Sequence, residues 1–273
     1  MPLEHGQRQR RLTEEDRIRR RAQLASVRVR RWANRPEPQR WVMSFSGGKD
    51  STAMLHVILR TGLPLDDVIF FDSGWEFPEV YAHLELVKRN TGMSITMVRP
   101  RVAWQDRLAR WGWPHWRRRW CTGDKGAALD RHTRACGKYV GLAFDERARC
   151  AKYLRSKTQV QHVRFPLVDA GMTTGQAMEF CRAQGYTWGG LYEVFPRFSC
   201  FCCPLQSLST IRKLATCRPA LFARLCAMHD AMPEARRKEG WKKGRSPSEA
   251  LAMAPARVLP ALSVTPQIGR AHV

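Results

Sequence analysis

The sequence predicts an α/β fold, a doubly wound parallel sheet with helices on both faces. Short apolar runs typical of buried strands alternate with longer helical stretches from residue 41 to residue 184. Gly follows several of the helical stretches, as in helix C-caps. Strands that alternate with helices are joined by right-handed crossovers, and such crossovers make the strands parallel.

Each expected element is a run of one pattern that turn residues close. Thr61-Gly62, Thr91-Gly92 and Gly185 end three of the helices. The expected strands are Trp41–Phe45, Val68–Phe71, Ser94–Val98 and Tyr139–Ala143, with an extended segment at Val163–Leu167, and the expected helices are Thr52–Arg60, Glu79–Asn90, Thr174–Gln184 and Ala220–Ala231.

Composition limits the classes of function. The 273 residues include 47 Lys and Arg against 24 Asp and Glu, a formal net charge of +23, which favours polyanionic partners such as nucleic acid. No apolar run approaches the roughly 18 residues of a membrane span, and no secretory h-region follows the N-terminal charges, so we expect a cytoplasmic protein without membrane contact. In that compartment the nine cysteines would be thiols or metal ligands, not disulfides.

Four regions are expected along the chain. Residues 1–39 form a basic arm, in which Thr13 could cap a short helix. Residues 40–213 form the α/β domain, and residues 214–267 form a helical and irregular extension. Residues 268–273 resemble translated sequencing-adapter sequence, so we expect them to lie outside the natural protein.

The segment Ser46-Gly-Gly-Lys-Asp-Ser51 carries the strongest functional signal. It lies between an expected strand and an expected helix, where backbone N–H groups and the helix dipole favour a phosphate. Glycine at 47 and 48 lets the backbone approach that phosphate closely. The spacing is not that of a Walker A loop, and a plain helix-opening turn is the alternative.

This segment resembles the PP-loop of the N-type ATP pyrophosphatases, the adenine nucleotide alpha hydrolase superfamily. Those enzymes cleave ATP between its α and β phosphates. Residues 68–78, Val-Ile-Phe-Phe-Asp-Ser-Gly-Trp-Glu-Phe-Pro, are similar to a segment of the phosphoadenosine-phosphosulfate (PAPS) reductase-like branch. Residues 141–149 resemble its G-x-R-x-D-E-S-x-R segment, with Ala143 and Arg147 in place of the usual Arg and Ser.

The resemblance implies an adenine nucleotide, ATP or PAPS/APS, and Mg²⁺. Asp72 and Glu76 are the candidates for Mg²⁺, because Asp72 ends a parallel strand, where α/β folds place ligands. An Asx-turn is the alternative role of Asp72. The expected catalytic residues are Lys49 and Asp50, and the expected nucleotide-binding residues are Ser46, Gly47, Gly48, Lys49, Ser51, Asp72, Ser73 and Gly74.

The segment Cys200-Phe-Cys-Cys-Pro204 has C-x-x-C spacing between Cys200 and Cys203, which suits a shared metal centre. The resemblance implies that Cys121 joins these two cysteines to hold a [4Fe–4S] cluster. Cys202 is the candidate for a fourth ligand, and the alternative is an open iron. Zinc and a buried group of free thiols remain alternatives. The single cysteines 136, 150, 181, 217 and 226 are expected to pack in the core.

Residues 110–121 interleave four Trp with four Arg. Such residues suit stacked bases and phosphates, but they could also shield a cluster at Cys121 or pack on the sheet. His115 receives no ligand role.

The sequence therefore predicts ATP-dependent activation coupled to sulfur transfer, with tRNA or DNA as acceptor and a sulfur donor or electron-donor protein as partner. A homodimer is left open. One alternative is a true sulfonucleotide reductase, although the Glu-Cys-Gly-Leu/Ile-His tail of that enzyme does not occur in this sequence. The other is a non-catalytic protein that binds nucleotide and nucleic acid and carries a structural metal cluster.

Overall fold

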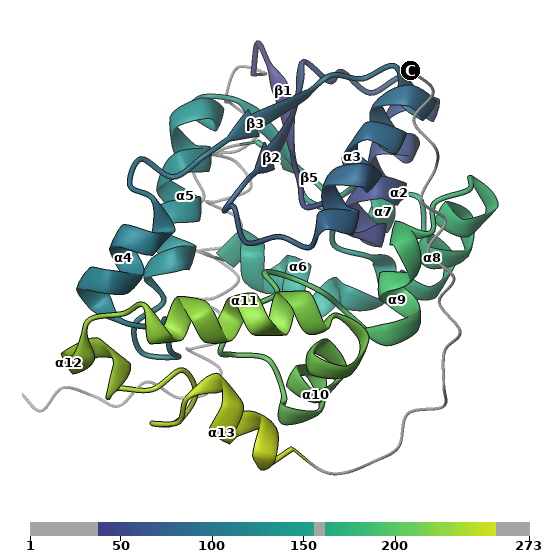
Figure 1. Ribbon diagram of the computed structural model, residues 1–273. Helices are drawn as coiled ribbons and strands as arrows, with labels where there is room; N and C mark the ends of the chain where they lie inside the picture. The colour runs from purple at the N-terminus through teal and green to yellow at the C-terminus, as the bar shows by residue number, and fades with distance from the viewer. Residues whose placement is uncertain (1–37, 156–161, 255–273) are drawn as a thin grey trace, which may run out of the picture. The chain divides into compact units, whose positions relative to one another are not determined.

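The computed structural model describes residues 38–155 and 162–254, so the predictions for the arm, for Thr13 and for the last residues lie outside the described part. From residue 39 onward the chain builds one five-stranded parallel sheet in the order β3-β2-β1-β4-β5 (Figure 1). The predicted doubly wound α/β fold is confirmed. The strands are β1 Trp41–Phe45, β2 Asp67–Phe71, β3 Ile95–Val98, β4 Gly137–Tyr139 and β5 Val163–Arg164.

The chain reverses its direction across the sheet after β3. It steps from β1 to β2 to β3 through α2 and α3, then returns past β1 to β4 and β5 through α4, α5 and α6. Because parallel crossovers are right-handed, the two directions place these helix sets on opposite faces, as Figure 1 shows for α3 and α5. The boundary between β1 and β4 is thus the topological switch point, the usual ligand site of such sheets.

Nineteen helices and strands are described in the chain outside the gaps. The α-helices are α2 Lys49–Arg60, α3 Pro78–Thr91, α4 Trp104–Trp111, α5 Trp120–Thr133, α6 Arg147–Arg155, α7 Pro166–Asp169, α8 Thr174–Ala183, α9 Leu191–Val194, α10 Leu208–Cys217, α11 Pro219–Asp230, α12 Glu234–Arg237 and α13 Pro247–Ala252, and the 3₁₀ helices are η1 Phe144–Glu146 and η2 Trp188–Gly190.

Strand β1 shows how burial positions the site. Of its residues Trp-Val-Met-Ser-Phe, only Ser44 is exposed, because a central parallel strand is covered on both faces. Helix α2 packs on the sheet through a continuous buried side that includes Met54, Leu55 and Ile58. The loop between β1 and α2 therefore joins two fully packed elements.

Several predicted boundaries were wrong. Helix α2 begins at Lys49, not Thr52, because Gly48 already serves as its N-cap. Strand β4 was predicted to span Tyr139–Ala143, but it ends at Tyr139. The residues after Tyr139 lie beyond the end of the strand. The segment predicted to be extended to Leu167 turns into α7 at Pro166, a residue suited to the first turn of a helix.

Several helices had no sequence prediction, among them α5 and α10. Helix α5 contains Gly123 and Gly126, which lower helix propensity, and it is fixed by tertiary packing instead. Helix α10 is capped by Ser207, whose hydroxyl accepts a hydrogen bond from the Thr210 amide. The predicted helix Ala220–Ala231 is present as α11.

Residues after α11, which lies in the lower part of Figure 1, contact the loop that carries Cys202. The Trp241 indole donates to the Cys202 carbonyl at 2.8 Å. The Lys242 ammonium donates to the carbonyls of Pro204 (2.7 Å) and Gln206 (2.5 Å). These bonds fix the loop that carries the three cysteines.

Within the described ranges, no helix has the length and apolar character needed to cross a membrane.

Gly47 offers a test of the β1–α2 turn. It has φ +73°, and a Cβ there would lie 2.9 Å from Val80 Cγ1. We expect Gly47→Ala to lower the free energy of unfolding in urea by about 2–4 kcal/mol, through left-handed strain plus this clash. The matched control is Gly62→Ala, which has φ +65° and open space, and which should lose only about 1–2 kcal/mol. Equal losses would contradict the clash.

Candidate functional site

The loop after β1 is closed by its own serines. The hydroxyls of Ser46 and Ser51 lie 3.0 Å apart, and the Ser51 hydroxyl donates to the Gly48 carbonyl at 2.8 Å. The Ser46 amide also donates to the Ser51 hydroxyl, at 3.3 Å. This network holds a tight turn open toward solvent at the start of α2.

The first turn of α2 supplies the positive end of a helix. Its N-cap, Gly48, has no side chain to bind the free N–H groups, so these groups and the helix dipole can receive an anion. The Lys49 ammonium pairs with the Asp50 carboxylate at 2.7 Å, and the two side chains are 13% and 31% exposed. Lys49 and Asp50 are therefore held together at the mouth of the loop.

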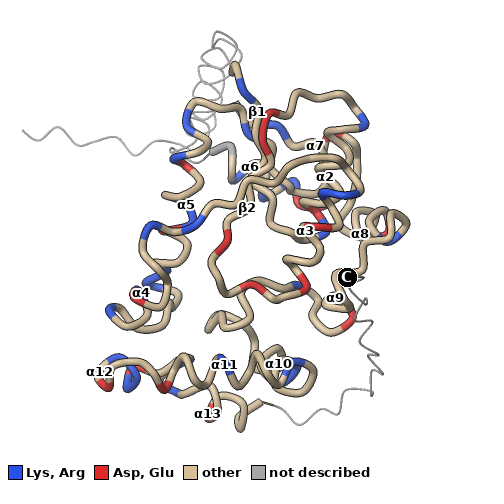
Figure 2. The backbone as a smooth tube through the Cα atoms, turned by 45° about the horizontal axis from the view of Figure 1, so that its top comes forward, with Lys and Arg blue, Asp and Glu red and all other residues tan. Residues whose placement is uncertain are grey.

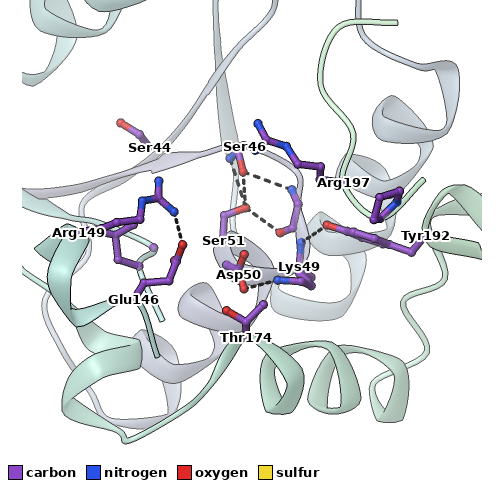
Figure 3. Close-up of a pocket in the computed structure, with 14 residues that line it drawn as sticks. Ser44, Ser46, Lys49, Asp50, Ser51, Glu146, Arg149, Thr174, Tyr192 and Arg197 are labelled. Carbon is purple, nitrogen blue, oxygen red and sulfur yellow. Dashed lines mark hydrogen bonds and ion pairs between the residues drawn. The ribbon is translucent and has the colours of Figure 1, made fainter. Parts of the chain in front are cut away.

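A pocket of about 500 Å³ lies over this turn (Figure 3). Its walls come from the ends of β1 and β4, so it is at the switch point of the sheet. Basic and hydroxyl side chains dominate the labelled lining. The lining residues are Ser44, Ser46, Gly48, Lys49, Asp50, Ser51, Gly141, Leu142, Glu146, Arg149, Thr174, Tyr192, Pro196 and Arg197.

Residues distant in the sequence hold the loop in place. The Tyr192 hydroxyl accepts a hydrogen bond from the Lys49 amide at 2.9 Å, and the Trp188 indole donates to the Gly47 carbonyl at 2.7 Å. Trp188 adopts the left-handed φ of +50°, which is rare for a bulky residue and is maintained by its surroundings. The ring of His83 stacks on Trp188 with centroids 4.6 Å apart. The loop geometry thus depends on side chains from α3, η2 and α9.

Asp72 is engaged within the protein. Its Oδ1 accepts from the Gly74 amide and from the Tyr81 hydroxyl at 2.7 Å, and its Oδ2 accepts from Arg99 Nε at 2.9 Å. The bond to Gly74 is the Asx-turn that the sequence left open. These hydrogen bonds and the Arg99 charge outweigh burial and lower the pKa of Asp72. Asp72, Ser73 and Gly74 line neither of the two pockets described here, and their roles in nucleotide and Mg²⁺ binding stay predictions.

Glu76 lies in a second pocket of about 160 Å³ that shares Ser46 and Gly48 with the first. Its carboxylate accepts from the Ser73 hydroxyl at 2.8 Å and contacts Cys200 Sγ at 3.7 Å. Burial raises the pKa of Glu76. The Lys125 side chain also lines this pocket, which therefore connects the loop to the first cysteine of the C-x-x-C pair.

The cysteines 121, 200 and 203 form a sulfur-rich region beside the second pocket. Burial, the Glu76 charge and the charges of Cys203 and Cys121 raise the pKa of Cys200 well above its ordinary value, so the three thiols lie within electrostatic range of one another. Cys202 is 1% exposed, and burial raises its thiol pKa strongly as well. The charges of Arg119 and Lys242 lower the pKa of Cys203, against a larger effect of burial.

These thiols fit the donor chemistry of an iron–sulfur cluster, whose irons each bind a different thiolate. In the described part of the chain, no three His, Cys, Asp or Glu side chains are close enough to share one metal ion. A cluster needs no such convergence on a single ion, and the nearby cations would offset thiolate charge. The assignment of Cys121, Cys200, Cys202 and Cys203 as ligands stays a prediction.

The segment 141–149 contributes part of the pocket. Gly141, Leu142, Glu146 and Arg149 line it, and Arg149 forms an ion pair with Glu146. Arg147, one of the two departures from the family pattern, instead places its guanidinium 3.9 Å from the centre of the Phe144 ring.

Sequence reasoning missed Thr174, Tyr192 and Arg197, which line the pocket from elements more than 120 residues after the loop. No local motif marks them. Only the packing of α8 against α2, and of η2 and α9 beside α3, brings them to the site.

Comparison with known proteins identifies the domain. Residues 40–204 match the family model described as the phosphoadenosine phosphosulfate reductase domain. The chain belongs to this family. The match covers β1, the loop Ser46–Ser51, the whole sheet and the cysteine segment up to Pro204. The PAPS reductase-like branch named from the motifs is thereby confirmed.

Three curated relatives show how far the similarity extends. An uncharacterized protein of Methanocaldococcus jannaschii is 26% identical over 217 residues, which are 74% of this chain and 44% of that protein. The phosphoadenosine 5′-phosphosulfate reductases of Thiocapsa roseopersicina and Alkalilimnicola ehrlichii are 36% identical over 78 residues and 32% identical over 122 residues. Those matches cover 28% and 44% of this chain, and 32% and 46% of the relatives. The chain thus spans less than half the length of each.

Two solved structures have lower sequence identity to this chain than the three relatives above. The phosphate complex of PAPS reductase from Candida auris has 16% identity and a TM-score of 0.40, over 64% of this chain and 88% of that chain. The U34-tRNA thiolase NcsA from Methanococcus maripaludis, solved with its [4Fe-4S] cluster, has 15% identity and a TM-score of 0.42, over 69% and 70%.

The buried His83 predicts a pH dependence of stability. Burial lowers its pKa from 6.5 to about 3, so His83 stays neutral in the fold while the unfolded chain takes up a proton below pH 6.5. The free energy of unfolding should therefore fall as the pH falls from 6.5 toward 3. In urea unfolding at several pH values between 7 and 5, His83→Asn should show a shallower fall than wild type.

The control is Val87→Ala, a buried change in the same helix that removes no titrating group. It should lower stability and keep the wild-type pH slope. An unchanged slope in His83→Asn would show that His83 is not the neutral buried base described above.

Proposed function

We propose that this protein is an enzyme that cleaves ATP between its α and β phosphates at the Ser46–Ser51 loop and uses the activation for sulfur transfer to a nucleic acid. The observation that carries the proposal is the pocket at the switch point, where a glycine-capped helix start meets serine hydroxyls and cationic side chains. Membership of the PAPS reductase domain family supports an adenine nucleotide as the ligand.

The loop would hold the β and γ phosphates. The Ser46 hydroxyl and the first-turn amides of α2, other than the Lys49 amide, which donates to Tyr192, are donors, and Lys49 adds a cation. The Ser51 hydroxyl would join them by leaving the Gly48 carbonyl. Arg149 and Arg197 line the same pocket and lie on opposite sides of Ser46 and Ser51 in Figure 3. With Mg²⁺ to neutralise the remaining charge, this set stabilises the pyrophosphate that leaves.

The reaction balances in two displacements. An oxygen of the acceptor attacks the α-phosphorus, the bond from that phosphorus to the β-phosphate bridge breaks, and pyrophosphate leaves with the electron pair. A sulfur nucleophile from a donor then attacks the activated carbon, and AMP leaves with the former acceptor oxygen. The role of Lys49 is to offset the charge on the leaving pyrophosphate, and Asp50 orients Lys49 through their ion pair.

The cysteines 121, 200 and 203, with Cys202 as candidate fourth ligand, would hold a [4Fe–4S] cluster. Such a cluster supplies a soft metal site for sulfide when bound. The second pocket, which contacts both the loop and Cys200, gives the short route that connects sulfur chemistry with the activated acceptor.

The acceptor class rests on charge. The net charge of +23 favours a polyanion, and tRNA or DNA satisfies it. A second candidate is reduction of PAPS or APS, which the names of two curated relatives support. Release of sulfite from PAPS with a thioredoxin donor would favour this reductase over the transferase.

Pyrophosphate release tests the ATP step. Anaerobically purified full-length protein, with Mg²⁺, ATP, sulfide and bulk tRNA or DNA, should form pyrophosphate. Ser46→Ala combined with Asp50→Ala should reduce the rate by at least about 100-fold, because one donor alone is typically worth that much. The matched control, Ser94→Ala with Asp169→Ala, changes the same residue types at exposed positions outside the pocket and should keep the rate. No pyrophosphate from wild-type protein under any of these conditions would contradict the proposal.

Iron analysis tests the cysteine set. The anaerobic protein should be brown and contain roughly four irons and four sulfides per chain. Cys121→Ser, Cys200→Ser and Cys203→Ser should each lose most of the iron, whereas Cys217→Ser, a half-buried cysteine elsewhere, should retain it. If Cys202→Ser also loses its iron, Cys202 is the fourth ligand, and if it retains the iron, the cluster has three protein ligands. If the wild-type protein is colourless and contains stoichiometric zinc, the cysteines form a zinc site and not an iron–sulfur cluster.

A further inference from the structure

The turn between α4 and α5 displays one tryptophan in solvent. Of the ten tryptophans in the chain, nine lie in described residues, and among those nine Trp116 alone is mostly exposed, at 73%. Leaving so large an apolar surface in water is unfavourable, because a buried Trp removes roughly 200 Å² from solvent. An exposed aromatic side chain on a folded turn therefore indicates a binding role.

The turn is rigid, which separates Trp116 from a side chain that merely lacks a place to pack. His115 and Arg118 exchange backbone hydrogen bonds of 3.2 and 2.9 Å across the turn. On either side, Trp113 is buried and donates to His229 at 3.1 Å, and Trp120 is buried and donates to the Gly112 carbonyl at 3.1 Å. The neighbouring tryptophans anchor the turn and leave Trp116 at its tip.

The arginines around the turn divide into two kinds. Arg107 is committed to Asp124 through two hydrogen bonds of 3.1 and 3.0 Å, and Arg118 is committed to Trp111 and Glu239. Arg110, Arg117 and Arg119 are exposed. Figure 2 shows several Lys and Arg along α4. Residues 99–119 contain seven arginines and only one acidic residue, Asp106.

The Arg117 guanidinium lies 4.6 Å from the centre of the Trp116 ring. This stacked pair presents one aromatic face beside a cation, the combination that holds an unpaired base and its phosphate. A duplex buries its base faces, so it cannot use the ring in this way. The geometry therefore favours a single strand or an unpaired loop.

The turn is also close to the cysteines. Trp116 and Cys121 are five positions apart in the sequence, so their Cα atoms are at most roughly 18 Å apart. A strand held at Trp116 would thus pass the sulfur-rich region within a few nucleotides.

We infer that the turn His115–Arg119 is a binding site for unpaired nucleic acid, in which Trp116 stacks on a base and Arg117 and Arg119 contact phosphates. The inference rests on the proposed function in one respect: it takes the bound strand to be the acceptor of the sulfur. Binding needs neither ATP nor an intact cluster.

The test measures binding without ATP. Fluorescence anisotropy of a short fluorescein-labelled single-stranded RNA, the same sequence as DNA and the corresponding duplexes is titrated with full-length wild-type protein. Trp116→Ala should weaken single-strand binding by about 5-fold to 100-fold, as expected for the loss of one stacked base. Trp116→Phe should restore most of the affinity, because it retains an aromatic face. Duplex binding should change little in both variants.

Charge is tested with a matched pair. Arg117→Ala should weaken binding and reduce the salt dependence of log K by about 0.7, the value for one phosphate contact on a single strand. Arg89→Ala removes an arginine that is also exposed, from α3 and outside this turn, and should leave both quantities close to wild type.

A direct readout excludes contributions from other basic regions. Photocrosslinking of an oligonucleotide that carries 5-iodouridine, followed by peptide mapping, should mark Trp116 itself. Wild-type affinity in Trp116→Ala, equal losses for single strand and duplex, or crosslinks only elsewhere would overturn the inference. So would Trp116-dependent binding to anionic lipid vesicles in place of oligonucleotides. Because pyrophosphate release is measured separately, an inactive ATP site and a failed strand contact give different results.

Discussion

The hydrogen bond between the two serines at the start of α2 is the constraint on which the site depends. It closes the short turn, residues 46–48, between a strand buried on both faces and a helix packed on the sheet. Neither neighbour can shift to relieve the turn, so the free amides of the helix keep a fixed direction. The left-handed conformation of Gly47 is the backbone consequence, and the indole of Trp188 holds its carbonyl. The geometry of this loop is thus a property of the packing around it as much as of the loop sequence.

The two pockets divide the chemistry. The larger one gathers hydroxyls and cations over the helix start, and the smaller one leads past Glu76 to Cys200. They share two residues of the loop, so a molecule bound in one lies against the contents of the other. This arrangement suits the proposed function, in which an activated oxygen and a sulfur must meet. The buried, uncharged thiols would be inert until a metal or an oxidant changes their state.

The sequence predicted the elements with strong local signals. The Ser46–Ser51 motif, the first three strands and the cysteine pair were found because their chemistry depends on neighbours in the chain. Helix α5 was missed because two glycines hide it, and Asp72 showed an Asx-turn and an Arg99 contact that spacing alone does not distinguish from ligand binding. Tyr192 and Arg197 could not be found at all, because only tertiary packing brings them to the loop. The Trp/Arg segment combined two roles: Trp113 and Trp120 belong to the core, and Trp116 does not.

The hydrogen bonds from Trp241 and Lys242 to the cysteine loop set the order in which parts of the chain can fold during synthesis. Both side chains bind backbone carbonyls between Cys202 and Gln206, yet they follow those residues by more than 35 positions. While the ribosome still holds residue 241, the sheet and its phosphate loop can already be folded, but the cysteine loop lacks its restraint. The cysteine loop therefore gains its final restraint late in maturation, and a nascent chain stalled before Trp241 would lack that restraint.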